Sequence, residues 1–309
     1  MTHLFVRPEP SAKITGGNLY NLQLIAALRA AGADVREITR DGDVRGHHAF
    51  VDSLYLDDLP RFAPCHLVAH YLPSLVSDTP LSDVERRALL AAAGFVVPSA
   101  FMADALTRLA PESRPVVVVA PGIDVAEIDM THLTPSSRAI VVANLVPGKG
   151  VLPLLAAIGN APFALAVVGS AYDDPDYARK CHAAAGPNVK FLGALSHVRT
   201  LAAVAASDFL VSPSRMESFG LALAEARALG IPIVARSGGN AAAHIDPAAG
   251  GALVDSDAAL AEECLALSLD RKALEGRRQA AREHRPPTRS WADAARDFLT
   301  AFPDSDRAG

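Results

Sequence analysis

The chain has 309 residues, of which half are hydrophobic and a fifth are charged, a composition typical of a globular protein with about two domains. Its net charge of −5 argues against nucleic acid as a partner, because phosphate neutralisation needs a basic face. No apolar run approaches the ~18 residues that span a bilayer, and the first apolar segment, residues 1–7, is too short for a secretory signal. We therefore expect a cytoplasmic protein without a transmembrane segment.

The first elements along the chain predict a parallel sheet. An apolar run at 3–7 is short enough for a buried strand, a helix at 19–31 follows a loop with Gly16 and Gly17, and 33–38 is a second strand. Strand, glycine loop, helix and strand form a βαβ unit. The glycine pair has two interpretations, a tight turn with close helix packing or a loop that cradles phosphate at a helix N-terminus.

Histidines are the candidate site residues in the next part. Residues 48–56 are mixed in pattern, and adjacent His47 and His48 point in divergent directions, which disfavours a metal pair. The strand at 66–72 carries His70 at its end, where ligands collect in α/β sheets, although a structural histidine is an equal alternative. We interpret His66, at the strand start, as structural.

The first α/β series continues with alternating helices and strands, predicted at 83–93, 94–98, 100–110 and 115–120. Apolar periodicity lapses at 124–137, which predicts an interdomain linker. The cysteines, Cys65, Cys181 and Cys264, lack the paired spacing of a metal or redox motif and are interpreted as buried thiols.

A second α/β series starts with a strand at 139–143, followed by the loop 144–150 that carries Lys149. The strand 165–168 ends in Gly169, and a short strand at 209–211 leads into the stretch 212–240. An amphipathic helix at 291–302 ends the pattern. We expect domains at 1–134, with helix 289–303 added, and at 135–288, with a ligand cleft between them.

The stretch 212–240 contains the strongest candidate site. Glu217 and Glu225 bracket a tight turn and the first turns of a helix, with seven residues between them. The N–H groups of Gly220, Leu221 and Ala222 are expected to be free at the helix start, which makes an anion site. Eight residues along a helix is about 12 Å, so Glu225 can reach back over a ligand bound there.

These motifs resemble the retaining glycosyltransferases of family four, which have the GT-B architecture of two Rossmann-like domains facing across a cleft. The E-x7-E motif from Glu217 to Glu225 carries most of the resemblance, and the match extends along 205–239. Supporting matches are Gly16-Gly17, Val97-Pro98-Ser99, Ala120-Pro121-Gly122-Ile123-Asp124, Lys149-Gly150 and Ser290-Trp291-Ala292-Asp293. The last of these resembles the family's terminal helix, which crosses back to the first domain.

The resemblance implies a nucleotide-diphosphate sugar donor, of UDP or GDP type, and residues that handle it. Glu217, His70 and Lys149 take the catalytic positions, with Glu217 beside the sugar ring and His70 near its hydroxymethyl group or the departing oxygen. Glu225 would bind the ribose hydroxyls. The donor-binding positions are Gly16, Gly17, Asn144, Lys149, Gly169, Ser218, Phe219, Gly220, Leu221 and Glu225. The family works without a metal or other cofactor, and its front-face mechanism gives the leaving phosphate the acceptor's proton.

Two departures from the family pattern stand out. The family has an arginine before its Lys-Gly loop, and here Asn144 takes that position, so one charge-assisted bond to the diphosphate is lost. Arg215 and Arg7 are the candidate replacements. The loop after Gly238-Gly239 lacks the usual acidic residue, although Gly239 and Asn240 could still face the donor sugar.

The compact first domain favours a small soluble acceptor over a polymer or lipid. Two alternatives stay open at this point: an epimerase or phosphorylase with the same fold, and a nucleotide-sugar-binding protein without catalysis.

Overall fold

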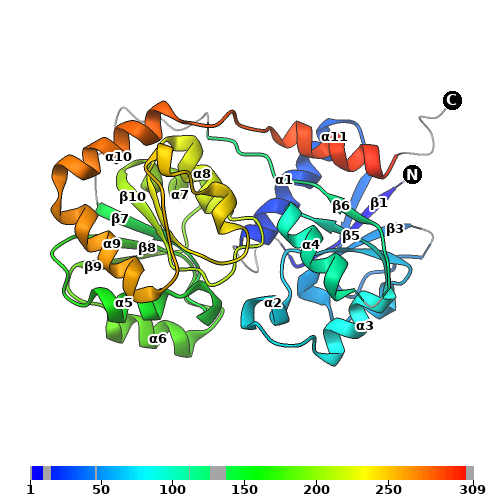
Figure 1. Ribbon diagram of the computed structural model, residues 1–309. Coiled ribbons are helices and arrows are strands. Elements are labelled where there is room, and N and C mark those ends of the chain that lie inside the picture. Colours follow the sequence, from blue (N-terminus) through cyan, green and yellow to red (C-terminus); the bar gives the residue numbers. More distant parts are fainter. Residues whose placement is uncertain (1, 10–14, 46, 111, 126–136, 304–309) are drawn as a thin grey trace. The chain divides into compact units, whose positions relative to one another are not determined.

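The computed structural model describes residues 2–9, 15–45, 47–110, 112–125 and 137–303 and divides into two compact units. Unit 1 comprises Met1–Gly122 and Arg289–Gly309, and unit 2 comprises Ile123–Thr288. The predicted domain boundary at 134 and most of the predicted linker lie outside the described residues. Figure 1 shows the chain with its elements labelled.

Unit 1 is built on a six-stranded parallel sheet with the strand order β2-β1-β3-β4-β5-β6. The chain runs from β1 to β2 on one side and then returns to place β3 on the other side of β1. This reversal is a topological switch point, where loops at the carboxyl ends of strands diverge. The strands are β1 (His3–Val6), β2 (Val35–Ile38), β3 (His48–Asp52), β4 (Cys65–Val68), β5 (Ala92–Val97) and β6 (Val116–Val118).

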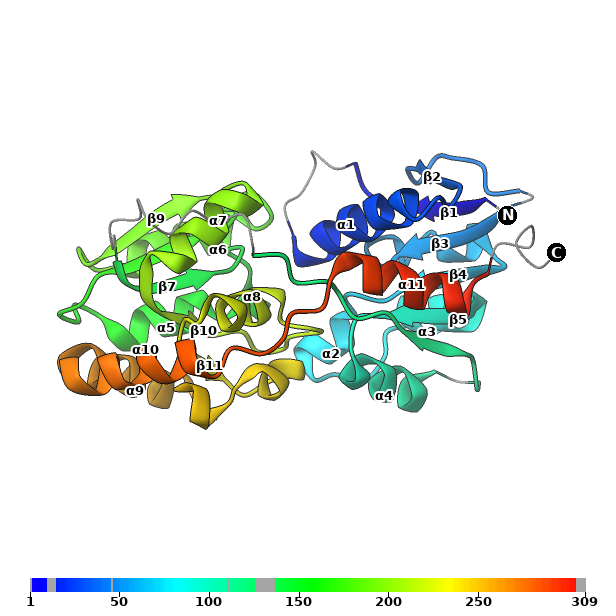
Figure 2. The same ribbon diagram turned by 90° about the horizontal axis from the view of Figure 1, so that it is seen from above.

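Helices cover both faces of this sheet, because successive strand residues point to opposite faces. Phe50 packs with α1 and α11, whereas Ala49 and Val51 pack with α3 and α4. Helix α11 belongs to unit 1 and contacts α1, which confirms the predicted return of the terminal helix; Figure 2 shows the two side by side. The helices are α1 (Gly16–Ala30), α2 (Pro73–Ser77), α3 (Asp83–Ala91), α4 (Ala100–Leu109) and α11 (Trp291–Ala301).

Unit 2 repeats the plan with a second six-stranded parallel sheet in the order β12-β11-β10-β7-β8-β9. The chain proceeds from β7 to β8 and β9 and then returns to place β10 beside β7, so these two central strands form the switch point. The strands are β7 (Ser137–Val142), β8 (Leu165–Val168), β9 (Val189–Gly193), β10 (Ser207–Ser212), β11 (Ile233–Arg236) and β12 (Ala252–Val254).

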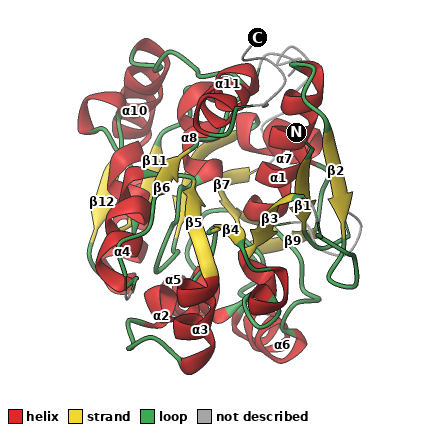
Figure 3. Cartoon of the chain, turned by 90° about the vertical axis from the view of Figure 1, so that its right-hand side faces the viewer, coloured by secondary structure: helices red, strands yellow, loops and turns green. Residues whose placement is uncertain are grey.

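The helices of unit 2 also form two layers, one on each face of its sheet; Figure 3 distinguishes helices and strands by colour. One face of the sheet packs with α5, α6, α9 and α10, and the other packs with α7 and α8. The helices are α5 (Val151–Ile158), α6 (Pro175–Ala184), α7 (His197–Ala205), α8 (Leu221–Leu229), α9 (Asp257–Leu269) and α10 (Arg271–Glu283). No helix in the described part of the chain has both the length and the apolarity needed to cross a bilayer.

Strand β3 and the short helix α2 are elements that the sequence pattern did not predict. The residues of β3 are buried on both faces, as in the interior of a parallel sheet, so the polar–apolar alternation that marks a half-exposed strand is missing. His48, its first residue, pairs through Nε2 with Nδ1 of His66 at 2.8 Å, on the neighbouring strand β4. Both rings contact Phe50 and Phe302, so the pair belongs to the aromatic core between the sheet and α11.

The partly buried histidine pair predicts that acid destabilises the protein. Burial lowers the pKa of His66 to about 4 and also lowers that of His48. An unfolded-chain histidine titrates near ~6.5, so the unfolded chain takes up protons first as the pH falls. We therefore expect the free energy of unfolding to be fully present above about pH 6.5 and to decrease between about pH 6.5 and 4.

Urea unfolding at a series of pH values measures this decrease. His66→Phe keeps an aromatic ring in the core and should flatten the decrease, whereas His284→Phe, at an exposed position after α10, should leave it unchanged. An equally steep decrease in His66→Phe and in the unsubstituted protein would show that the pair is not its source.

Candidate functional site

An ion pair joins the two loops at the switch point of unit 2. Lys149 ends the short 3-10 helix Pro147–Lys149 after β7, and Glu217 lies in the loop after β10; Nζ and Oε1 are 3.0 Å apart. The Arg215 N–H donates to the Gly148 carbonyl at 3.0 Å and holds the same loops together through the backbone. The lysine side chain is 35% exposed, so the ion pair adds about 1 kcal/mol or less to stability. Its main consequence is the placement of an ammonium and a carboxylate at the edge where α/β sheets bind ligands.

The turn that follows Glu217 presents the start of helix α8. Gly220 has a φ of 94°, a left-handed conformation that side chains other than glycine rarely adopt, and Leu221 begins the helix. No side chain caps this N-terminus. The first N–H groups of a helix have no partner within the helix and carry partial positive charge. Glu217, Lys149 and an uncapped helix start therefore lie together at this edge of the sheet.

The loop after β11 fixes the shape of this turn. The Asn240 N–H donates to the Glu217 carbonyl at 2.7 Å, and Glu217 forms a parallel bridge with Gly239. The Phe219 carbonyl accepts from Asn240 Nδ2 at 2.7 Å and from His244 Nε2 at 2.6 Å. Asn240 and His244 belong to the 3-10 helix Asn240–His244. The loop after β11, which lacks the acidic residue of the family pattern, thus holds the turn through hydrogen bonds from Asn240 and His244.

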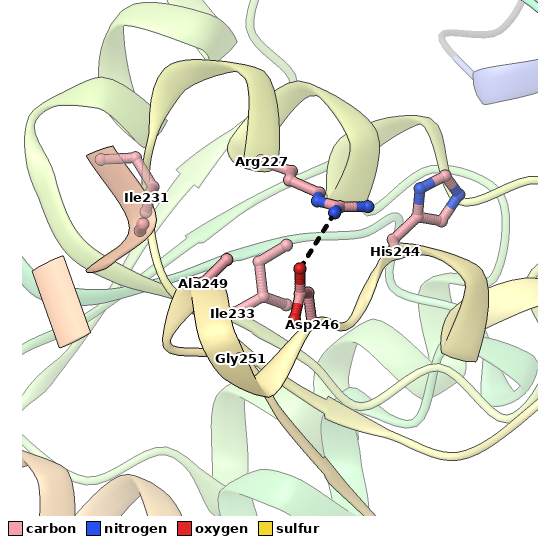
Figure 4. Close-up of a pocket in the computed structure, with 8 residues that line it drawn as sticks. Arg227, Ile231, Ile233, His244, Asp246, Ala249 and Gly251 are labelled. Atoms are coloured by element: carbon pink, nitrogen blue, oxygen red, sulfur yellow. Dashed lines mark hydrogen bonds and ion pairs between the residues drawn. The ribbon is translucent and has the colours of Figure 1, made fainter. Parts of the chain in front are cut away.

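Beneath His244 lies a small pocket, shown in Figure 4, that is too small for a substrate. Its volume is about 10 Å³, which is no more than a water molecule needs. Arg227, from α8, pairs across it with Asp246 at 3.4 Å. This pocket is a packing gap between α8, α10 and the loop after β11.

Glu225 is buried one helical turn into α8 and is bonded to a histidine that the sequence analysis did not single out. His197 is the first residue of α7, and its Nε2 lies 2.6 Å from Glu225 Oε1. Burial raises the pKa of Glu225, and the hydrogen bond from His197 opposes that shift. The hydrogen bond to Glu225 raises the pKa of His197 despite its partial burial. Oε2 of Glu225 has no hydrogen-bond partner among the described residues and can accept one from a ligand.

Asn144 connects the loops after β7 and β8. Its Oδ1 accepts from the Ser170 N–H at 2.9 Å, and its Nδ2 donates to Asp173 at 3.1 Å. The Leu145 N–H donates to the Ser170 carbonyl at 2.8 Å, so the contact is reciprocal. Gly169, just before Ser170, donates its N–H to the Gly193 carbonyl at 3.0 Å. The side-chain amide of Asn144 therefore links the loops after β7 and β8 through hydrogen bonds, and these bonds do not require a charge.

Both candidate replacements for the family arginine have other partners. Arg7 is buried and pairs with Glu37 in unit 1. Arg215 lies 3.7 Å from Asp257, at the start of α9. Among the described residues, Lys149 is the cation that forms an ion pair with Glu217.

In unit 1, His70 and Gly17 lie in contact. Gly16 and Gly17 begin α1, and Thr15 caps this helix by accepting from the Asn18 N–H at 3.1 Å. A Cβ at Gly17 would lie 3.2 Å from the His70 ring, whereas one at Gly16 would meet nothing within 4 Å. Close packing against His70 thus explains why a glycine occupies position 17. At Gly16, the first residue of the helix, there is space for a side chain. His70 lies just beyond β4, with its Nε2 3.0 Å from Asn21 Oδ1.

The structure therefore gathers the predicted residues into two groups, one at the switch point of each sheet. The group in unit 2 comprises Asn144, Lys149, Gly169, Glu217, Ser218, Phe219, Gly220, Leu221 and Glu225. The group in unit 1 comprises Gly16, Gly17 and His70. Sequence analysis missed His197, His244, Asn21 and Asp52, which carry no motif of their own. His197 begins α7 and His244 follows β11, whereas Asn21 lies inside α1 and Asp52 ends the strand that was not predicted. No cluster of three metal-ligating side chains occurs within the described ranges, and metal independence stays a prediction.

The chain shares its fold with solved structures of other proteins. The chain superposes on sucrose-phosphate synthase from Thermosynechococcus elongatus with a TM-score of 0.74 and 20% identity, covering 100% of this chain and 99% of that one. For Anabaena HepE in complex with UDP-glucose, the TM-score is 0.77, the identity 18%, and the coverage 98% and 99%. The chain thus has the GT-B fold, with two Rossmann-like units.

Sequence comparison gives a matching class for unit 2. Residues 132–284 match the family described as Glycosyl transferases group 1. A mannosyltransferase of Corynebacterium glutamicum, described as a GDP-mannose-dependent monoacylated alpha-(1-6)-phosphatidylinositol monomannoside mannosyltransferase, is 32% identical over 182 residues. The D-inositol 3-phosphate glycosyltransferase of Corynebacterium kroppenstedtii is 35% identical over 127 residues. These matches cover 53% and 40% of this chain, but only 46% and 28% of those proteins.

The contact between His197 and Glu225 predicts a measurable shift in titration. In the unsubstituted protein, the pKa of His197 should lie above the ordinary histidine value of about 6.5. In Glu225→Gln the carboxylate is gone and burial dominates, so the pKa of His197 should fall. Histidine titration by NMR measures both values. Glu262→Gln, at an exposed position on α9, is the control, and an unchanged pKa in Glu225→Gln would contradict the contact.

Proposed function

We propose that this protein is a retaining, metal-independent glycosyltransferase, which moves a hexosyl group from a UDP- or GDP-type sugar donor to a small soluble acceptor. The observation that carries the proposal is the ion pair of Lys149 and Glu217 beside the uncapped start of α8, within the part of the chain that matches the Glycosyl transferases group 1 family. The alternatives, an epimerase, a phosphorylase or a binding protein, lack a specific observation in their favour.

The donor's diphosphate would bind at the start of α8. The N–H groups of Gly220 and Leu221 offer donors and the positive end of a helix dipole, which favour an anion. Lys149 supplies a full positive charge at the same edge of the sheet. These groups stabilise most strongly the charge that develops on the leaving diphosphate as the bond to the sugar breaks. Asn144, at the position of the family arginine, links two loops and carries no charge. Lys149 and the backbone N–H groups at the start of α8 would therefore provide this stabilisation.

Glu225 is proposed to hold the nucleoside of the donor. Its Oε2 would accept a hydrogen bond from a ribose hydroxyl, while Oε1 stays bonded to His197. The buried carboxylate has its orientation set before the donor binds, which lowers the entropic cost of binding.

The transfer step follows the mechanism that the family resemblance implies. The bond from the anomeric carbon to the phosphate oxygen breaks, the acceptor oxygen bonds to the same face of that carbon, and the leaving phosphate takes the acceptor's proton. Glu217, paired with Lys149, would stabilise the positive charge on the sugar ring and would not need to accept a proton. His70 and the loops of unit 1 would serve the acceptor and the sugar.

The names of two relatives indicate which substrates to test first. The C. glutamicum protein is described as GDP-mannose-dependent and the C. kroppenstedtii protein as acting on D-inositol 3-phosphate, which makes a GDP-type donor and a polyol acceptor the first pair to test. We retain the cytoplasm as the proposed location.

Glu217→Ala and Glu225→Ala should each lower donor turnover, measured as transfer or hydrolysis, by at least about 100-fold, because each removes a polar contact to the donor. Release of nucleoside diphosphate from a series of UDP- and GDP-sugars, with and without polyol acceptors, provides the assay. Glu262→Ala, an exposed glutamate on α9, should retain full turnover.

Full turnover in both glutamate variants would overturn the proposed site. Conversion of the donor sugar to its epimer without release of nucleoside diphosphate would identify an epimerase. Calorimetry that showed tight donor binding without turnover over the acceptor series would identify a binding protein.

A further inference from the structure

His70 is the end of a chain of three hydrogen-bonded side chains in unit 1. Its Nε2 lies 3.0 Å from Asn21 Oδ1, and Asn21 Nδ2 in turn donates to Asp52 Oδ2. The other oxygen of Asp52 accepts from the Leu54 N–H at 2.7 Å. Asn21 is 1% exposed and Asp52 is 2% exposed, so water does not compete for these bonds.

The chemistry of this chain allows one arrangement of protons. Both Asp52 oxygens accept a hydrogen bond, one from Asn21 Nδ2 and one from the Leu54 N–H. The Asp52 carboxylate therefore presents an acceptor to Asn21. Asn21 must therefore turn its NH₂ toward Asp52 and its carbonyl oxygen toward His70. An amide oxygen only accepts hydrogen bonds, and so the proton of the neutral imidazole must be on Nε2. The other ring nitrogen, Nδ1, then keeps its lone pair.

The surroundings of the ring keep it neutral and in place. Burial lowers the pKa of His70, against the opposing effect of the Asp52 carboxylate. The edge of Tyr20 packs on the ring at a centroid distance of 4.6 Å, and Gly17 lies against it. Nδ1 has no partner among the described residues. His70 and Asp52 each stand at or just beyond the carboxyl end of a strand, near the switch point between β1 and β3.

We propose that Asn21 and Asp52 are positioning residues that fix His70 as the neutral tautomer with the proton on Nε2, so that Nδ1 accepts a hydrogen bond from a substrate hydroxyl group. This inference rests on the proposed function for the identity of the hydroxyl as one on the sugar or the acceptor. The other tautomer would present an N–H at the same point, which can donate to the hydroxyl oxygen but cannot accept the hydroxyl proton. A substrate group without a hydroxyl proton, such as a methyl ether, would lose this bond.

The tautomer can be read directly, without substrate. In ¹⁵N-histidine NMR spectra, Nδ1 of His70 should have the chemical shift of an unprotonated ring nitrogen and Nε2 that of a protonated one. The His70 signals are assigned by their loss in His70→Asn. A protonated Nδ1 in the unsubstituted protein would overturn the proposal.

Asp52→Asn is the decisive variant because it keeps the shape of the side chain. The Leu54 N–H still requires an oxygen, so the new amide must turn its NH₂ toward Asn21. Asn21 would then reverse, its NH₂ would face His70, and the proton would move to Nδ1. The double variant Asn21→Asp with Asp52→Asn restores an acceptor opposite Nε2, and the original tautomer should return. An Asp52→Asn protein that keeps the Nε2 proton would overturn the proposal.

A structural and a kinetic readout complete the test. The signals of the His48–His66 pair, in the same unit, should stay unchanged in each variant and so report that unit 1 is folded. If donor turnover is present, it should fall about 10-fold or more in Asp52→Asn and recover in part in the double variant. Absence of turnover in the unsubstituted protein would contradict the proposed function alone, whereas unchanged turnover with a reversed tautomer would contradict the role of Nδ1.

Discussion

The ion pair between Lys149 and Glu217 is the contact around which the loops of unit 2 are ordered. Adjacent parallel strands β7 and β10 send their connections in opposite directions, which leaves their loops without a shared helix to hold them. The ion pair and the bond from Arg215 to Gly148 join these loops, and Asn240 joins the loop after β11 to the same turn. Because the uncapped start of α8 follows directly, the polar groups converge where a diphosphate would bind.

The two units use their switch points in different ways. Unit 2 presents a cation, two carboxylates and free backbone N–H groups, which suit a charged nucleotide donor. Unit 1 presents a neutral imidazole with its proton fixed by buried neighbours, which suits a hydroxyl group. Buried polar chains of this kind are stable only when each member is paired, and here each inner member is. The same sheet architecture thus carries two different sets of polar groups, which lie near the ends of corresponding strands.

The sequence predicted the residues whose chemistry is tied to a local motif and missed those that act through tertiary contact. The turn from Glu217 to Gly220 and the helix after it follow from glycine positions and periodicity, and these predictions of the fold are confirmed. Strand β3 was missed because burial on both faces removes alternation, and Asp52 at its end was missed with it. Asn144 was interpreted as a lost charge, whereas its two loop contacts could not be inferred before β7 and β8 were paired.

The central claim is that Lys149 and the start of α8 recognise a diphosphate. Calorimetry of UDP and GDP against UMP and GMP measures this most directly. The account predicts that at least one diphosphate binds tenfold or more tightly than its monophosphate, and that most of this difference is lost in Lys149→Met but kept in Lys180→Met, an exposed lysine on α6. Equal affinity for diphosphate and monophosphate, or an unchanged difference in Lys149→Met, would contradict it.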